Sequence, residues 1–483
     1  MHTQFFGKVK LWLLVILFLF VGVTDAKAEI ELTDTLTMTG FLRQMCAVNI
    51  GTGNPRTLAE NDGDKNRFNL IRTMLEAEFD YVPTDAFKVH AKTRFIYDMT
   101  YMLDSNLGQY DTRIWMPNRY GTDLRTGSSR VIGAELYEIW ASYEWDAGYV
   151  KVGKQQIAWG EVPALRLIDL VNPLDKSWHL TLEPEEYENI RIAEWMGRLY
   201  VSLPRTMTGI FEDVFIDTWI NPGDLHYEQH PAVGSPYQDG FSGSMPNEDY
   251  DRRGDIEWGA RIGFNMAGAQ LTFSYLDVYM DYATFDLSSG TLVGEFPKAE
   301  VYGVNFNYAF NNPIAATLNV ELSHTPDQAW HDRSAPAGLG VAQKGYTRLA
   351  IWAARDLYVV PKWTAMAATL LFYIHRIEDD DEIQLSPGPY GPGNSLKNFN
   401  MHTWYLKLTQ EIGKGRRHTV MFNPMIQTDS AYTIKASYKW SPSEKWKYEL
   451  MGLWNGGSGA PLSILGSGRQ WQDEVYARIT YSF

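Results

Sequence analysis

Strict alternation of apolar and polar residues is the feature of this sequence that most limits its fold. The carboxyl-terminal segment shows it most cleanly, with one apolar face and one mainly polar face: Val475, Ala477, Ile479, Tyr481 and Phe483 against Glu474, Tyr476, Arg478, Thr480 and Ser482. A period of two residues is that of a β-strand, because successive side chains point to opposite faces of a sheet. We therefore expect a strand with one side suited to lipid and the other to water.

The same alternation recurs along the chain, at residues 87–97 and 256–264. Further strands are predicted to start near residues 30, 68, 134, 148, 197, 211, 269, 300, 315, 346, 366, 401, 418, 431 and 446. Each covers about ten residues, the length of a tilted strand that crosses a membrane. The sequence thus predicts about eighteen strands, or about sixteen if the weak segments at 197–220 or 418–440 each form one strand.

Connection lengths alternate in the way expected of a bacterial outer-membrane barrel, with short periplasmic turns and long extracellular loops. Short links fall at residues 82–85, 146–147, 267–268, 311–313, 413–415 and 441–444. Long links fall at residues 50–66, 99–133, 160–196, 221–255, 283–298, 325–345, 377–399 and 456–471, while the link near 428–430 is short. We predict an all-β, transmembrane, antiparallel up-and-down barrel that forms a single domain over residues 29–483.

The amino terminus predicts export from the cytoplasm. Lys8 and Lys10 precede an apolar run at residues 11–23, and small residues at Ala26 and Ala28 fit a cleavage site, so residues 1–28 are interpreted as a signal peptide. Aromatic residues make up 14% of the chain, which suits the aromatic belts of a membrane barrel. The net charge of -15 argues against a nucleic-acid partner. We expect the protein in the bacterial outer membrane.

Charged residues are predicted to face inward on two neighbouring strands. Alternation turns Arg72, Glu76 and Glu78 inward on one strand, and Lys88, Lys92 and Arg94 inward on its hairpin partner. One interpretation is that these six residues line a water-filled pore. The alternative is that they only stabilise the wall, at roughly 0.2–1 kcal/mol for each pair. Both interpretations require a hydrated interior, since so many charges do not fit a dry core.

The long link that begins near residue 160 is a candidate constriction of the pore. It could fold back into the barrel, or it could form an external cap, because its length allows both. In the first case its polar residues would line the narrowest part of the pore: Gln155, Glu161, Arg166, Asp169, Asp175 and Arg191.

Three short motifs in this region carry a resemblance to a known family: Gly153-Lys154-Gln155, Trp159-Gly160-Glu161 and Asn172-Pro173-Leu174-Asp175. Their order is similar to that in a proteobacterial outer-membrane β-barrel (porin-like) family of unknown function (DUF1302-like). In that family arginine is commoner at the position that Lys154 occupies here. The resemblance implies a barrel and transfers no catalytic or binding residue. In addition, Phe483 resembles the terminal residue of outer-membrane barrels that the outer-membrane assembly machinery reads.

The function expected from these features is a porin-like channel for passive diffusion of small solutes. Two alternatives stay open, namely a barrel that sheathes or docks an envelope export or electron-transfer complex, and a transporter of apolar compounds. Motifs of metalloproteases, haem attachment and serine hydrolases are absent, so we expect no enzyme, no cofactor and no catalytic metal. Acidic clusters at 62–64 and 378–382 could bind Ca²⁺ or Mg²⁺ on lipopolysaccharide, or they are solvated loop charges. Expected partners are outer-membrane lipid, lipopolysaccharide, a small solute and the assembly machinery, with a homo-oligomer left open.

Overall fold

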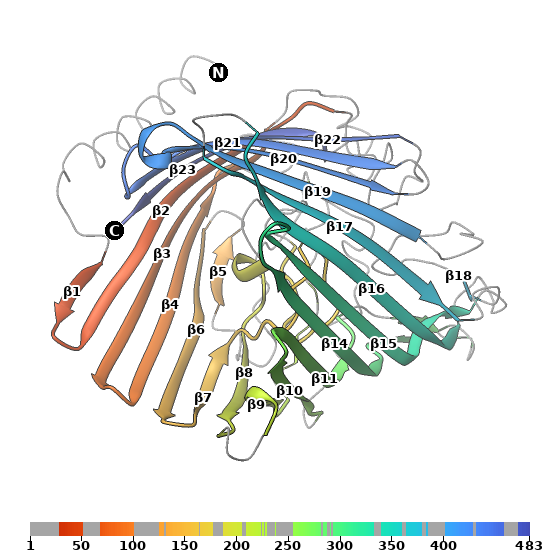
Figure 1. Ribbon diagram of the computed structural model, residues 1–483. Coiled ribbons are helices and arrows are strands. Elements are labelled where there is room, and N and C mark those ends of the chain that lie inside the picture. The colour runs from red at the N-terminus through yellow and green to blue at the C-terminus, as the bar shows by residue number, and fades with distance from the viewer. Residues whose placement is uncertain are drawn as a thin grey trace.

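Eighteen antiparallel strands form a closed ring in the described part of this computed structural model (Figure 1). The structure describes residues 29–51, 68–100, 125–129, 132–163, 165–176, 187–204, 209–223, 225–226, 228, 237, 255–281, 284–286, 290, 293–332, 340–359, 364–378, 383–384, 401–427, 431–457 and 472–483. Each strand pairs with the next in the ring, and β23 closes on β2. In order they are β2 (Leu36–Asn49), β3 (Phe68–Thr84), β4 (Phe87–Asp98), β6 (Ile132–Trp145), β7 (Gly148–Gln155), β8 (Glu194–Ser202), β9 (Glu212–Asn221), β10 (Glu257–Met266), β11 (Ala269–Tyr279), β14 (Lys298–Phe310), β15 (Ala316–Asp332), β16 (Val341–Leu357), β17 (Met366–Ile377), β19 (Met401–Ile412), β20 (His418–Gln427), β21 (Tyr432–Trp440), β22 (Trp446–Gly456) and β23 (Glu474–Ser482).

Short strands extend the sheet or pair outside it. β1 (Ile30–Thr33) pairs with β2, β5 (Arg125–Ser129) with β6, and β18 (Ile383–Gln384) with β15, while β12 (Thr284–Asp286) and β13 (Val293–Glu295) form a separate hairpin. Two short 3-10 turns occur at Tyr187–Asn189 and Lys414–Arg416. Within the described ranges, no helix has the length and apolar character needed to cross a membrane.

The chain ends meet where the ring closes. The backbone N–H of Gly40 donates to the carbonyl of Phe483, and the N–H of Phe483 donates back to the carbonyl of Gly40, each at 2.9 Å. A side chain at position 40 would come within 2.9 Å of the Phe483 ring, which is why glycine stands there. The terminal aromatic residue is therefore part of the seam of the barrel.

The two faces of the wall differ as the alternation predicted. On β23, Ala477 and Ile479 are exposed on the outside, whereas Glu474, Tyr476 and Arg478 are buried on the inside. Exposed aromatic side chains gather near both ends of the outer face. Those at the end of the barrel that carries the short turns include Tyr81, Tyr143, Trp145, Tyr358 and Trp440, and those at the opposite end include Phe68, Trp258, Trp404, Tyr432 and Trp454. Aliphatic residues such as Leu450 are exposed between them, so the outer face has the banding of a transmembrane barrel.

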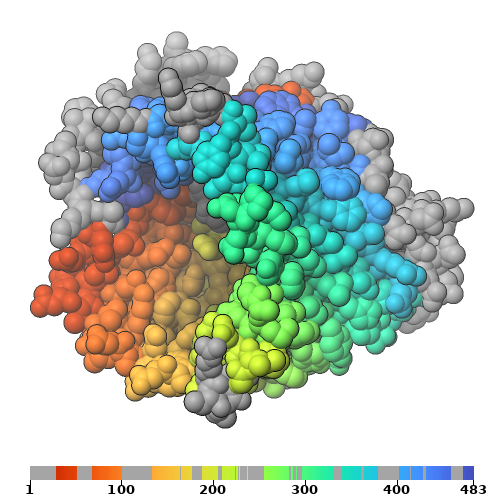
Figure 2. Space-filling model, in the orientation of Figure 1, coloured from red at the N-terminus to blue at the C-terminus, as the bar shows by residue number. Residues whose placement is uncertain are grey.

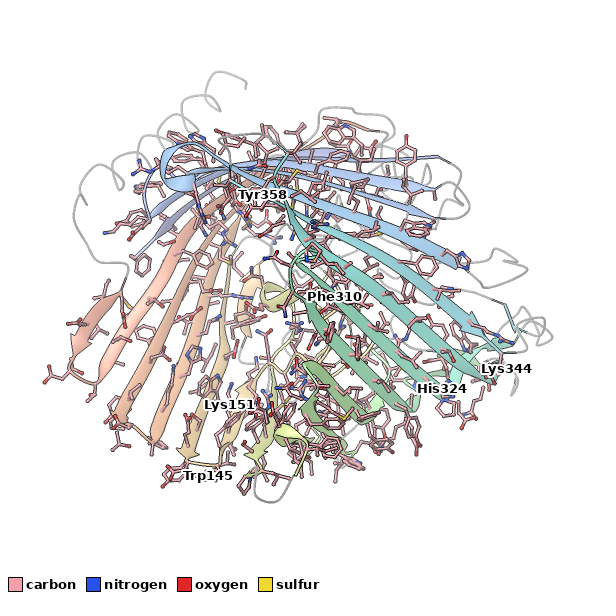
Figure 3. All side chains as sticks on the ribbon, viewed as in Figure 1. Trp145, Lys151, Phe310, His324, Lys344 and Tyr358 are labelled. Atoms are coloured by element: carbon pink, nitrogen blue, oxygen red, sulfur yellow. The ribbon has the colours of Figure 1, made fainter. Side chains whose placement is uncertain are left out.

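Figure 2 shows that the wall curves around a hollow, with the amino-terminal strands in red and orange facing the middle strands in green. Trp145 and Tyr358, labelled in Figure 3, lie at the end of the barrel that carries the short turns, Trp145 at the end of β6 and Tyr358 just beyond β16. We call this the short-turn end, and the other the long-loop end.

The structure settles the strand count and corrects one loop. Residues 197–220 and 418–440 each form two strands, so the alternative of sixteen strands is wrong. The long link predicted at 325–345 is also wrong, because β15 runs to Asp332 and β16 begins at Val341. A register shift between Thr325 and Gln328 accommodates Pro326, and Trp330 packs edge-on against Tyr346 at 5.2 Å, which stabilises the strand extensions. Residues 1–28, 62–64 and 379–382 lie outside the described residues.

Candidate functional site

The link between β7 and β8, residues 156–193, folds into the barrel, and we call it the crossing loop. Many of its described apolar side chains are almost fully buried, whereas Leu165 and Leu170 are half-buried and Ala158 is exposed. The buried side chains pack against inward residues of β8, β9, β11, β14, β16, β17 and β19. Ile168 lies so close to Gly303 of β14 that any side chain at position 303 would collide with it, at 2.6 Å. The loop therefore fills the side of the interior that these strands enclose. This is the position that the inward-loop interpretation predicted.

Two charged residues of the wall anchor the tip of the crossing loop. The carboxylate of Glu321 on β15 accepts hydrogen bonds from the backbone N–H of Glu161 at 2.9 Å and of Ile168 at 3.1 Å. On β16, the guanidinium of Arg348 donates to the carbonyls of Arg166 at 3.1 Å and Leu167 at 2.7 Å. The bonds to Ile168 and Leu167 satisfy backbone groups that would otherwise be buried without partners.

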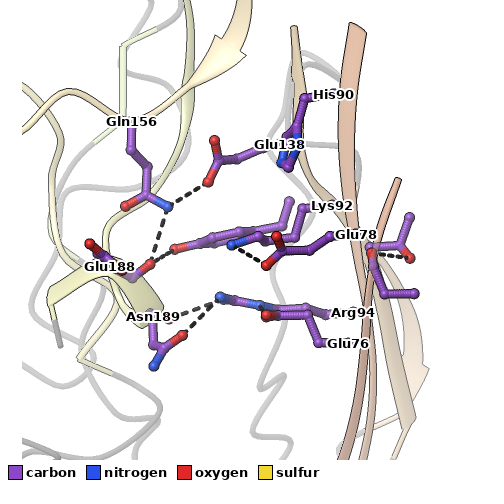
Figure 4. Close-up of polar contacts among 12 residues, drawn as sticks. Glu76, Glu78, His90, Lys92, Arg94, Glu138, Gln156, Glu188 and Asn189 are labelled. Atoms are coloured by element: carbon purple, nitrogen blue, oxygen red, sulfur yellow. Dashed lines mark hydrogen bonds and ion pairs between the residues drawn. The ribbon is translucent and has the colours of Figure 1, made fainter. Parts of the chain in front are cut away.

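The returning part of the loop is anchored at another part of the wall. On β4, Arg94 donates to the carbonyl of Asn189 at 3.0 Å (Figure 4). On β6, the hydroxyl of Tyr137 donates to the carbonyls of Glu188 and Arg191, and Glu138 accepts a bond from Gln156 at 2.9 Å.

The two anchor sites lie on opposite walls. β16 is the ninth strand after β4 around the ring of eighteen, in the order β6, β7, β8, β9, β10, β11, β14, β15, β16. Half of a closed ring separates two strands that face each other across its diameter. The crossing loop thus spans the lumen from wall to wall.

Acidic and basic side chains pair across β3 and β4 on the inner wall. Glu76 bonds to Arg94 at 2.5 Å, and Glu78 bonds to Lys92 at 2.8 Å. Closer to the short turns, Lys88 lies 2.9 Å from a carboxylate oxygen of Asp80. Side-chain exposure rises along this series, from 1% at Arg94 through 18% at Lys92 to 39% at Lys88. Water thus reaches the wall from the short-turn end up to the level of Lys92, and the crossing loop covers the wall beyond.

The sixth of the predicted pore-lining residues lies deeper. Arg72 pairs with Asp98 at 2.9 Å, and both side chains are buried. The six residues thus fall into two groups, with Glu78, Lys88 and Lys92 partly exposed and with Arg72, Glu76 and Arg94 buried.

The structure brings three of the predicted constriction residues together and separates the others. Asp169 lies 2.6 Å from Arg191 and 3.5 Å from Arg166, inside the crossing loop. Glu161 is exposed, and it accepts a hydrogen bond from Asn307 of β14 at 2.8 Å.

The remaining two predicted constriction residues, Gln155 and Asp175, are buried and take part in hydrogen bonds between segments of the chain. Gln155 is fully buried and donates to the carbonyl of Met196 at 2.9 Å, which joins β7 to β8. Asp175 is buried, and its backbone N–H donates to the carbonyl of Ile190.

Sequence reasoning missed the residue that holds the crossing loop together. The side chain of Asn172 is fully buried, accepts from the N–H of Ile157 at 2.7 Å, and donates to the carbonyls of Gln155 and Ile192 at 3.3 and 2.9 Å. Its place in the Asn-Pro-x-Asp motif was the available signal. Gly160 of the Trp-Gly-Glu motif has a similar explanation, because a side chain there would lie 2.8 Å from Asp169.

A second link, between β9 and β10, also reaches into the interior. The hydroxyl of Tyr237 donates to Glu474 of β23 at 2.9 Å, and burial together with this carboxylate raises the pKa of Tyr237 well above its usual value. Tyr237 is therefore a neutral donor. Glu228 pairs with Lys176 at 2.5 Å, which connects this link to the crossing loop. Across the described residues, no group of three or more His, Cys, Asp or Glu side chains is arranged to hold a metal ion.

The chain is similar to several solved structures, and two of them reach a TM-score of 0.50. OccAB2 from Acinetobacter baumannii is 9% identical, with a TM-score of 0.50 over 94% of this chain and 99% of that chain. OccAB3 from the same organism is 8% identical, with a TM-score of 0.50 over 93% of this chain and 99% of that chain. The outer membrane protein opdK from Pseudomonas aeruginosa is 11% identical, with a TM-score of 0.48 over 93% and 98% of the two chains.

Sequence comparison gives the family. No curated protein matches the chain in sequence. A family model described as "Protein of unknown function (DUF1302)" matches residues 23–434, which include all three motifs around the crossing loop. The resemblance predicted from those motifs is confirmed, and the chain belongs to this family.

Proposed function

We propose that the protein is a porin-like channel of the bacterial outer membrane, through which small solutes diffuse passively. The observation that carries this proposal is the crossing loop, which is anchored on opposite walls of a closed barrel and leaves a charged wall open to water at the short-turn end. A chain that only needed a filled core would not keep Lys88 and Asp80 partly exposed inside the ring.

The two groups of wall residues then have different parts in conduction. Glu78, Lys88 and Lys92 contact the solute path, whereas Arg72, Glu76 and Arg94 hold the wall and the loop. The proposal assigns the constriction to the crossing loop, where exposed Glu161 faces the path and Asp169, Arg166 and Arg191 fix the loop conformation. Passage is driven by the concentration gradient, so the channel needs neither a cofactor nor a catalytic group. We also propose that residues 1–28 are a signal peptide that directs export of the protein to the outer membrane.

Single-channel conductance in a planar lipid bilayer tests the proposal. The full-length protein should give discrete conductance steps, and deletion of residues 162–190 should enlarge them because it removes the constriction. A folded protein that inserts and gives no steps would rule out the channel. Unchanged steps after the deletion would rule out the constriction. If the deleted protein fails to fold, Glu321→Ala releases the loop tip while the whole chain is retained.

A further inference from the structure

Three basic side chains lie at one level of the inner wall, two of them on neighbouring strands. In the strand register, Lys88 of β4 is opposite Ser142 of β6, Ser142 is opposite Lys151 of β7, and Lys151 is opposite Arg198 of β8. Directly opposed residues have Cβ atoms about 4.5–5.5 Å apart. Figure 3 labels Lys151 on this part of the wall, near the short-turn end. We call Lys88, Lys151 and Arg198 the basic row.

The carboxylates around the basic row neutralise it only in part. Asp80 pairs with Lys88 at 2.9 Å. Asp217 is shared by two guanidiniums, Arg198 at 2.7 Å and Arg261 at 3.0 Å, so this group keeps a net positive charge.

Among the described residues, the Lys151 side chain has only an aromatic partner. Its ammonium lies 3.7 Å from the centre of the Trp140 ring, and no carboxylate of the described residues is within ion-pair distance of it. Glu138 acts on Lys151 only through its electrostatic field, and it accepts a hydrogen bond from Gln156. Lys151 has no carboxylate partner among the described residues, and Arg198 and Arg261 share one carboxylate. Positive charge is therefore in excess at this level of the wall.

Such an arrangement is unfavourable in the absence of an anion. Like charges directly opposite each other in a β-ladder destabilise the sheet. Lys151 and Arg198 are such a pair, and both are partly exposed to the lumen. A bound anion would remove the repulsion, and a guanidinium beside an ammonium offers a carboxylate several charge-assisted hydrogen bonds.

Aromatic rings next to the basic row provide a surface for an apolar group. Trp140 lies under Lys151, and Tyr149 lies 5.7 Å below the guanidinium of Arg198 and stacks on Tyr200 at 5.4 Å. These rings are partly exposed on the inner wall. They can contact the flat body of a ligand whose charged end meets the basic row.

We propose that the basic row is a binding station for small organic carboxylates with a flat apolar body. This deepens the proposed channel function, since it names the class of solute that the short-turn end of the lumen selects. The carboxylate binds between Lys151 and Arg198, Ser142 adds a hydroxyl donor, and the apolar body lies on Trp140 and Tyr149.

Isothermal titration of the folded protein in detergent with benzoate tests the station without requiring conduction. Wild-type protein should bind benzoate, Lys151→Met should weaken binding at least tenfold, and benzyl alcohol, which lacks the charge, should not bind. Lys439→Met is the matched control, because Lys439 faces inward on β21, far from the row, and this variant should bind as wild type does. The Lys151→Gln variant repeats the test if Lys151→Met fails to fold.

The outcomes separate the two proposals. Equal affinity in the Lys151 and Lys439 variants, or no binding by the wild type, overturns the station whatever the conductance. Binding that depends on Lys151 in a protein that gives no conductance steps supports the station and overturns the channel. In a conducting protein, benzoate should also reduce the current, and this block should disappear with Lys151→Met.

Discussion

Removing the carboxylate of Glu321 should release the tip of the crossing loop. In Glu321→Ala, the backbone N–H of Ile168 loses its acceptor while it stays buried, whereas the N–H of Glu161, on an exposed residue, can bind water instead. A buried donor without a partner costs about 1–3 kcal/mol, so the attached loop loses about 1–3 kcal/mol relative to a detached loop whose N–H groups bind water. Because 1.4 kcal/mol is a factor of ten, the ratio of detached to attached loop rises at least about fivefold.

Single-channel recording is the assay for this change. We expect larger or more frequent high-conductance states in Glu321→Ala, and a smaller effect in Glu321→Gln, which keeps one acceptor oxygen. Glu300→Ala is the matched control, since Glu300 is exposed on the outer face of neighbouring β14 and does not touch the loop. If Glu321→Ala and Glu300→Ala give the same current traces as the wild type, the loop is not held as described.

Three further predictions concern the loop anchor, the wall and the outer face. Arg348→Met removes the donors to two loop carbonyls and should change the conductance in the same direction as Glu321→Ala. The conductance of the double variant should differ little from that of either single variant, because both residues hold the same part of the loop. Arg94→Met removes the cation that lies 2.5 Å from the buried carboxylate of Glu76 and should lower the free energy of unfolding by about 3–5 kcal/mol. Lys88→Met, at the exposed end of the same strand, should lower it by about 0–1 kcal/mol, and equal urea midpoints of the two variants would contradict the burial described. Leu450→Arg places a charge on the outer face between the aromatic belts and should lower the free energy of unfolding in lipid vesicles by about 2–4 kcal/mol. Ser437→Arg, which places the same charge on the inner face, should lower it much less. Both values are measured by tryptophan fluorescence in urea, and similar losses in the two variants would argue against a lipid-facing surface at Leu450.

The sequence predicts this fold well because a barrel wall is specified locally. Each strand has its own alternation, as in Glu474 to Ser482, and no information from elsewhere in the chain is needed to assign its faces. The strand extensions at Asp332 and Val341 were not predictable in this way. Pro326 and its polar neighbours are typical of a turn, and only the packing of Trp330 on Tyr346 shows that the strands continue.

The candidate site depends on contacts between distant residues, which a sequence pattern does not contain. Glu321 bonds to a backbone group 160 positions earlier, and Arg348 bonds to one 182 positions earlier. Sequence reasoning assigned Arg94 to the inner face, yet its depth of burial is set by Asn189, in another part of the chain. The alternation gives the side of the wall, and the crossing loop decides which of those residues water can reach.

The loop that joins opposite walls also has a mechanical consequence. Ladder hydrogen bonds hold neighbouring strands together, but they resist bending of the sheet only weakly, so a wide ring can be squeezed toward an ellipse by the surrounding lipid. Bonds from Arg94 on one wall and Arg348 on the other make the loop a tie beam across the diameter. Widening of the barrel along this diameter would therefore have to break these bonds or stretch the loop between them.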